Sequence, residues 1–155
     1  MKIATGLSAS LEDYLEAIFH IVADKHVARA KEVAQRLGVT RPSVTVALRA
    51  LAERELINYT PYEVITLTPE GTRISEDVVR RHQTLQDFFV KVFSIEAKRA
   101  DKAACDMEHT LPPEVLLPLT EFVDFVERCP ECLEGFRQEQ ARKKGSVREA
   151  NGVAG

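Results

Sequence analysis

Residues 31–67 read KEVAQRLGVTRPSVTVALRALAERELINYTPYEVITL, and their pattern decides the fold. The apolar spacing predicts a short helix over 31–37, and Gly38 follows it where a helix C-cap commonly adopts the left-handed conformation. Thr40 can cap a second helix that extends to about Glu55. Two helices separated by so short a turn are typical of a helix-turn-helix, a DNA-reading motif.

Apolar and polar residues alternate immediately after the second helix. Residues 56–59 and 64–67 are predicted to be strands, with a turn at Thr60 and Pro61 between them. A β-hairpin in this position is the wing of a winged helix-turn-helix. A three-helix protein-interaction domain without a DNA role is the alternative, and the hairpin counts against it.

Helical periodicity surrounds this module on both sides. Ser10 can cap a first helix, and residues 68–70 (Thr-Pro-Glu) can cap a long fourth one whose periodic apolar residues continue to Val92. Further helices are expected over about 96–110 and 113–129. The chain is therefore predicted to be mainly α.

Three parts of the chain follow from this order of elements. We expect a winged helix-turn-helix over residues 1–72 and a helical domain over residues 73–140. The remaining residues, 141–155, are polar and basic and then small, and we expect them to be disordered.

The charge of the chain is unevenly distributed. The formal net charge is -3, yet six basic residues stand against two acidic ones between Arg29 and Arg54. A basic module on an acidic body suits a protein that contacts phosphates with one face. A solvated pair of helices explains the charge equally well.

The second helix of a helix-turn-helix presents short polar or basic side chains at the end that enters the major groove. Here that end carries hydroxyl and guanidinium groups for phosphates or base edges, and small apolar groups for a thymine methyl. The candidate DNA-contacting residues are Lys31, Thr40, Arg41, Pro42, Ser43, Thr45, Val46 and Arg49.

Sequence features also bear on location and redox state. No apolar stretch is long enough to cross a bilayer, and residues 1–6 lack the pattern of a secretory signal, so we expect a cytoplasmic protein without a membrane partner. Three cysteines argue against a disulfide framework. Cys129 and Cys132 form a CxxC motif, which is half of a zinc site or a redox pair; two cysteines in a helix-to-turn connection are the favoured interpretation.

Three places along the chain carry potential metal ligands at helical contact spacing, where side chains three or four residues apart share a face. They offer carboxylate, imidazole and thiolate groups, enough to bind a first-row divalent ion. An acidic pair at the start of a helix and a surface histidine would explain them without a metal, and the spacing does not show that the three faces converge. The candidates are Asp13 and Glu16, then His82, then Cys105, Glu108 and His109.

Several of these stretches resemble, in the same order, the diphtheria toxin repressor and manganese transport regulator family. The matching stretches are 10–18, 42–45, 67–71, 81–82 and 105–109. The resemblance covers about residues 8 to 136. It implies that the helical domain binds metal and dimerises, and that the chain is the two-domain form without an SH3-like third domain.

The resemblance also implies a ligand set of mixed character. Asp13, Glu16, His82, Glu108 and His109 match ligands of the manganese-type regulators, whereas Cys105 matches the iron type. The iron type has an ancillary site, in which Gln86 and Asp101 of this chain replace a glutamate and a histidine. We expect Fe(II), with Mn(II) close behind, because thiolate favours the softer ions.

We therefore expect a metal-dependent repressor that binds a palindromic operator in double-stranded DNA as a homodimer and controls metal-homeostasis genes. A winged-helix regulator that senses thiol oxidation or a small organic ligand is the alternative. An enzyme is not expected, because the chain has no HExxH motif, nucleophile elbow or phosphate loop.

Overall fold

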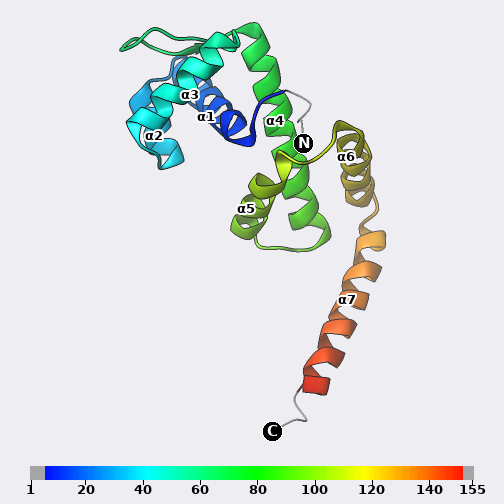
Figure 1. Ribbon diagram of the computed structural model, residues 1–155. Helices are drawn as coiled ribbons and strands as arrows, with labels where there is room; N and C mark the ends of the chain where they lie inside the picture. The colour runs from blue at the N-terminus through cyan, green and yellow to red at the C-terminus, as the bar shows by residue number, and fades with distance from the viewer. Residues whose placement is uncertain (1–5, 152–155) are drawn as a thin grey trace.

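The computed structural model describes the backbone of residues 6–151 and the side chains of residues 6–142 except Pro113. Helices dominate the described part, as predicted, and a two-stranded sheet is the exception (Figure 1). The first half forms a compact unit around α1, and the long helix α4 leads from that unit into the second half. The elements of the first half are α1 (Ala9–Lys25), α2 (Ala30–Leu37), α3 (Arg41–Glu53), β1 (Ile57–Asn58) and β2 (Thr66–Leu67).

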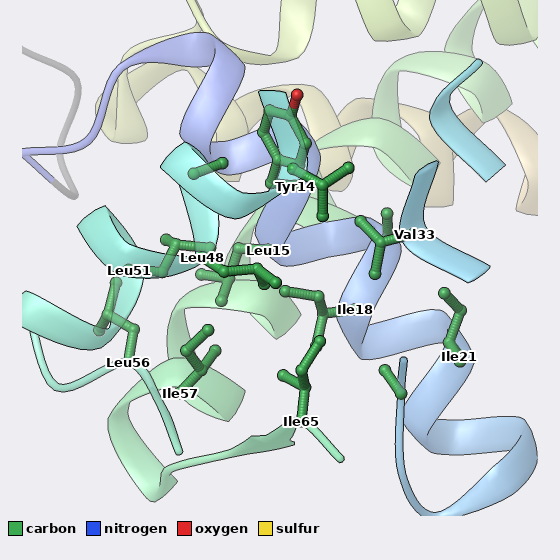
Figure 2. Close-up of a cluster of buried hydrophobic side chains, with 14 of the residues drawn as sticks. Tyr14, Leu15, Ile18, Ile21, Val33, Leu48, Leu51, Leu56, Ile57 and Ile65 are labelled. Carbon is green, nitrogen blue, oxygen red and sulfur yellow. The ribbon is translucent and has the colours of Figure 1, made fainter. Parts of the chain in front are cut away.

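A single hydrophobic core holds the winged module together. Leu15 and Ile18 of α1 meet Leu48 and Leu51 of α3, and Ile65 closes the cluster from the wing (Figure 2). All five side chains are completely buried. Their burial provides the main stabilisation of the module, since each fully buried aliphatic side chain contributes about 1.5–3 kcal/mol.

The helix boundaries follow their capping residues. Gly38 has φ 66° at the end of α2, and Thr40 caps α3 by accepting a hydrogen bond from the Ser43 amide, both as predicted. The prediction for α1 is wrong by two residues, because Ser8 rather than Ser10 is the N-cap. The Ser8 hydroxyl accepts the amide hydrogen of Leu11, which the sequence pattern alone did not distinguish.

The wing is shorter than predicted. Only Ile57–Asn58 and Thr66–Leu67 form the antiparallel ladder, with Ile57 opposite Leu67. Ile65 instead pairs with Ala28, which anchors the second strand to the connection between α1 and α2. This pairing draws Ile65 into the core and leaves the tip of the hairpin exposed.

The wing is joined closely to the start of α4 (Pro69–Asp87). The Thr68 hydroxyl donates to the carbonyl of Glu55 at 2.7 Å, and the Thr68 amide donates to the carbonyl of Leu56 at 3.1 Å. A Cβ atom at Gly71 would collide with that same Leu56 carbonyl. Glycine is therefore required here to let α4 approach the backbone just before β1.

The second half consists of helices arranged around α4. The predicted single helix through Val92 changes at its end into a π-helical turn, and the disorder expected over 141–151 is replaced by a helix that projects from the rest of the chain in Figure 1. Helix-forming residues and the Glu139–Arg142 ion pair account for that extension. Residues 152–155 of the expected tail lie outside the described part. The elements are η1 (Phe88–Val92), α5 (Ala97–Glu108), α6 (Pro113–Arg128) and α7 (Pro130–Asn151).

Candidate metal centre and DNA-binding face

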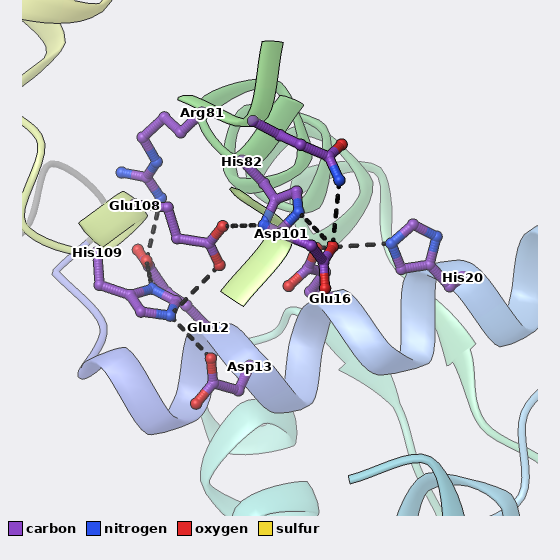
Figure 3. A network of polar contacts seen from close by, with 10 residues as sticks. Glu12, Asp13, Glu16, His20, Arg81, His82, Asp101, Glu108 and His109 are labelled. Atoms are coloured by element: carbon purple, nitrogen blue, oxygen red, sulfur yellow. Dashed lines mark hydrogen bonds and ion pairs between the residues drawn. The ribbon is translucent and has the colours of Figure 1, made fainter. Parts of the chain in front are cut away.

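Three helices bring five of the predicted metal ligands to one place (Figure 3). Asp13 and Glu16 extend from α1, His82 from α4, and Glu108 and His109 from the end of α5. The convergence could not be derived from helical spacing, because it depends on how α1 packs against α4 and α5.

One group of potential ligands consists of Asp13, Glu108 and His109. One ligand atom from each lies within 4.8 Å of the others. His109 Nε2 is 2.8 Å from Asp13 Oδ1 and 3.4 Å from Glu108 Oε1. An imidazole nitrogen and two carboxylate oxygens at this separation can bind a divalent cation.

A second group consists of Glu16, His82 and Glu108, again within 4.8 Å. His82 Nδ1 donates to Glu108 Oε2 at 2.6 Å. Glu108 therefore belongs to both groups, with one carboxylate oxygen directed to each. The two groups could hold one cation or two neighbouring ones.

The electrostatics of the centre favour the arrival of positive charge. Burial and the nearby Glu108 carboxylate raise the pKa of Glu16. Hydrogen bonds to Asp13 and Glu12 raise the pKa of His109 to about 10, and the hydrogen bond to Glu108 raises the pKa of His82. The proton on His109 therefore supplies positive charge that a cation would supply, and the raised pKa of His82 favours a second proton.

One buried atom tests directly whether these residues fit a metal ion. Glu108 is completely buried, and its Oε1 atom accepts no hydrogen bond among the described residues. A buried carboxylate oxygen without a donor is costly unless a cation balances it. The observed residues therefore fit a bound divalent cation.

Glu12 and its partner Arg81 belong to this network but were not among the predicted site residues. The side chain of Glu12 is completely buried and accepts hydrogen bonds from His109 Nδ1 at 2.8 Å and from Arg81 Nη2 at 3.0 Å. The sequence signal that could have identified Glu12 is its position beside the apolar residues of α1 that face the core. The neighbouring Asp13 was predicted as a metal ligand, and Glu12 was given no role.

The other predicted ligands lie at the edge of the centre. Cys105 is outside both groups, and burial together with Glu108 raises the pKa of its thiol to about 11, so its role as a ligand stays a prediction. Asp101 Oδ1 accepts hydrogen bonds from His82 Nε2 at 3.2 Å and from Gln86 Nε2 at 3.4 Å. The structure thus brings the ancillary residues together, and metal binding there also stays a prediction.

The CxxC motif lies at the connection between α6 and α7, as expected from its position before a helix break. Cys129 and Cys132 form a disulfide, with their Cα atoms 5.5 Å apart. The bond was only one of the alternatives considered, and the structure selects it. Cys132 also borders an apolar hollow formed with phenylalanines of η1 and α6.

A basic hollow of about 340 Å³ opens between the helix-turn-helix and the wing. Four of the candidate DNA-contacting residues, Lys31, Arg41, Thr45 and Arg49, line it, and their contact with DNA stays a prediction. Arg29, at the start of α2, and Tyr62, in the wing, line it as well, although neither was among the candidate DNA-contacting residues. The remaining candidates are exposed at the start of α3, where Val46 is 68% exposed and the Thr40 and Ser43 hydroxyls bond each other at 2.9 Å.

Comparison with protein families decides the identity of this arrangement. Residues 6–65 match the N-terminal DNA-binding domain of the iron-dependent repressors, and residues 68–137 match their metal-binding and dimerisation domain. The chain belongs to the iron-dependent repressor family. It is a metal-dependent transcriptional regulator, and the predicted fold of a winged helix-turn-helix followed by a helical dimerisation domain is confirmed.

Individual relatives agree with this assignment. An HTH-type transcriptional regulator of Methanocaldococcus jannaschii is 32% identical over 119 residues, which are 76% of this chain and 95% of the relative. The regulator MntR of Geobacillus kaustophilus is 28% identical over 135 residues, which are 87% of this chain and 95% of MntR. Family membership does not favour the alternative of a thiol-sensing or organic-ligand-sensing regulator.

A solved structure shares the fold as well. A manganese-dependent transcriptional repressor in complex with manganese matches with a TM-score of 0.67 and 26% identity, over 74% of this chain and 53% of that chain. The chain thus spans about half the length of that structure. No helix within residues 6–151 is both long and apolar enough to cross a membrane.

Proposed function

We propose that this regulator represses metal-homeostasis genes by binding a palindromic operator as a homodimer when loaded with Mn(II) or Fe(II). The observation that carries the proposal is the position of Glu108, whose carboxylate is shared by two groups of potential ligands. Those groups join α1 of the DNA-binding module to α4 and α5 of the dimerisation domain. The centre therefore lies at the joint between the two domains.

The residues of the joint define how metal would control DNA binding. Asp13, Glu16 and Glu108 place three carboxylates close together, and these repel one another when the histidines lose their protons. A bound divalent cation supplies the positive charge that these carboxylates require. Asp13 and Glu16 would then hold α1 in one orientation against the dimerisation domain.

Operator recognition depends on that orientation. The two recognition helices of a dimer must lie about one turn of DNA, roughly 34 Å, apart. Metal favours the DNA-competent state only by its greater affinity for that state. The factor by which metal raises DNA affinity must therefore equal the factor by which DNA raises metal affinity. The proposal can therefore be tested by measuring DNA affinity with and without metal, or metal affinity with and without DNA.

The donor atoms bear on the choice of metal. Both groups contain oxygen and imidazole nitrogen, which suit Mn(II) and Fe(II). The manganese complex of the structural relative supports Mn(II), and the iron-dependent repressor family supports Fe(II). We propose these two ions as the physiological candidates.

The dimer would form through the apolar surface of α6 and its neighbours. Phe122 and Phe125 are 44% and 52% exposed, and both border the apolar hollow of about 280 Å³ next to Cys132. Exposed clusters of aromatic residues mark protein interfaces. This surface falls within the residues that match the dimerisation domain, so we propose a second copy of the chain as its partner.

Anaerobic titration of the metal-stripped chain with Mn(II) and with Fe(II) tests the proposal. Fluorescence anisotropy on a labelled palindromic duplex at fixed salt would follow DNA binding in parallel. We expect binding of at least one ion and a rise in DNA affinity with that ion. Asp13→Ala and His109→Ala should abolish this rise in DNA affinity and leave a folded dimer. DNA affinity of the wild-type chain that does not change with metal would refute the proposed metal switch.

A further inference from the structure

The carboxylate of Glu12 is completely buried at the joint between the domains, as is that of Glu108. The Glu12 side chain has no exposed surface, and its partner Arg81 is 4% exposed. A buried carboxylate is tolerated only when it is paired and hydrogen-bonded. Here Arg81 of α4 and His109 at the end of α5 provide that pairing to a residue of α1.

The two ring nitrogens of His109 face different partners. Nδ1 donates to Glu12, while Nε2 faces Asp13 Oδ1 at 2.8 Å and Glu108 Oε1 at 3.4 Å. The Oε1 atom of Glu108, which accepts no hydrogen bond among the described residues, is thus on the Nε2 side. The contact with Glu12 therefore determines which nitrogen of His109 is available to a cation.

We propose that Glu12 is a positioning residue of the metal centre, which holds His109 through Nδ1 so that Nε2 is directed at the cation. Glu12 itself does not touch the cation. A carboxylate behind a ligating histidine fixes the ring and its tautomer, and loss of such a partner typically weakens metal affinity 10–100-fold. The inference rests on the proposed metal switch and adds a residue to it.

Arg81 extends this role from one side chain to the joint. Arg81 belongs to the dimerisation domain, and Glu12 lies in the DNA-binding module next to the ligand Asp13. The Arg81 Nε atom is buried and makes no hydrogen bond among the described residues, so the guanidinium depends strongly on the Glu12 carboxylate. The pair therefore docks α1 of the DNA-binding module onto α4 of the dimerisation domain.

The first test compares Glu12→Gln with Glu70→Gln in the 155-residue chain. Glu70 is a matched control because it also pairs with an arginine, Arg73, but on the exposed surface of α4. Mn(II) affinity should fall 10–100-fold in the Glu12 variant and stay unchanged in the control. Equal Mn(II) affinity of the two variants would overturn the proposal.

Glu12→Gln disturbs two contacts at once, the ion pair with Arg81 and the hydrogen bond to His109. A second pair of variants separates the effects of these two contacts. Arg81→Met and Glu12→Gln with Arg81→Met have the same arginine removed and differ only at Glu12. Mn(II) affinity should again be 10–100-fold lower in the double variant. If the two bind Mn(II) equally, Glu12 acts only as the partner of Arg81 and the proposal is wrong.

Nitrogen-15 NMR of the imidazole rings gives a readout that does not depend on DNA binding. In the wild-type chain loaded with Zn(II), His109 should retain the Nδ1 proton and bind the metal through Nε2. In the metal-free chain, Glu12→Gln should shift the Nδ1 resonance of His109, and Glu70→Gln should leave it in place. Zinc ligation through Nδ1, or an unshifted resonance in the Glu12 variant, would overturn the proposal.

The two proposals fail in distinguishable ways. If the wild-type chain binds neither Mn(II) nor Fe(II), the proposed function fails, and the metal-free NMR comparison still decides whether Glu12 positions His109. If the wild-type chain binds Mn(II) and Glu12→Gln binds it equally well, only the role of Glu12 fails.

Discussion

His82 Nδ1 lies 2.6 Å from Glu108 Oε2, and this contact joins α4 to α5 inside the candidate metal centre. The same carboxylate faces His109 with its other oxygen. Glu108 is therefore the residue on which both groups of ligands depend.

Replacing Glu108 should remove metal binding more completely than any other single change. Glu108→Gln keeps the shape of the side chain but removes the charge shared by the two groups. We expect Mn(II) affinity to fall by more than about 100-fold, which exceeds the usual loss for an outer-shell partner. Calorimetric titration measures the change. Asp106→Asn, at an exposed neighbouring position, serves as the control and should bind Mn(II) normally.

Metal binding should release protons. The pKa of His109 is raised to about 10, so its ring is protonated in the metal-free chain at neutral pH, and the pKa of His82 is raised as well. A cation must displace protons from the nitrogens that it uses, and metal affinity should therefore rise with pH. Titration in buffers of different ionisation enthalpy measures the released protons. Binding without proton release would contradict the assignment of histidine ligands.

The stability of the metal-free chain should fall as the pH rises, whereas its metal affinity should increase. Because the folded-state pKa of His109 lies above its unfolded value of about 6.5, its protonation stabilises the fold fully at lower pH. That contribution is lost as the pH rises from about 6.5 through about 10. We expect the thermal midpoint to fall over this window, and to fall less in His109→Gln. Thermal denaturation monitored by circular dichroism provides the comparison.

The basic hollow should contribute to DNA affinity through phosphates. Arg41→Ala and Arg49→Ala remove cations that line it, and each should weaken binding and reduce the slope of log affinity against log salt by about one. Arg36→Ala is a suitable control, since Arg36 is exposed in the same module but does not line the hollow. Anisotropy at several salt concentrations distinguishes the variants, and an equal loss in all three would show that the hollow has no special role.

The disulfide should matter locally. It closes a short loop, for which a chain-entropy argument gives about 2 kcal/mol of stabilisation. Cys129→Ser with Cys132→Ser should increase hydrogen exchange at the start of α7 and leave Mn(II) affinity unchanged, because both residues lie outside the metal centre. A loss of Mn(II) affinity in this variant would show that the α6–α7 connection is coupled to the centre.

Much of the fold could be predicted because its signals are local. Thr40, Thr68 and Gly38 mark helix ends by interactions with residues a few positions away, and the structure confirms each of them. Five ligand candidates were found in the same way, from their spacing and from a family resemblance.

The features that escaped prediction depend on long-range packing. The role of Glu12 depends on its hydrogen bonds with Arg81 and His109, which are 69 and 97 residues away in the chain. The extent of the wing likewise depends on the pairing of Ile65 with Ala28. Neither relationship has a period or a motif that a single sequence can show.

The close approach of Gly71 to the Leu56 carbonyl has a consequence for protein engineering. The DNA-binding unit does not end at the last strand of the wing, because the first turn of α4 is part of its packing. A chimera that joins this DNA-binding module to another sensor domain should therefore have its junction beyond Gly71. The two family matches meet earlier, between residues 65 and 68. A cut at the earlier junction would place a foreign side chain against the strand and remove the Thr68 contact that fastens it.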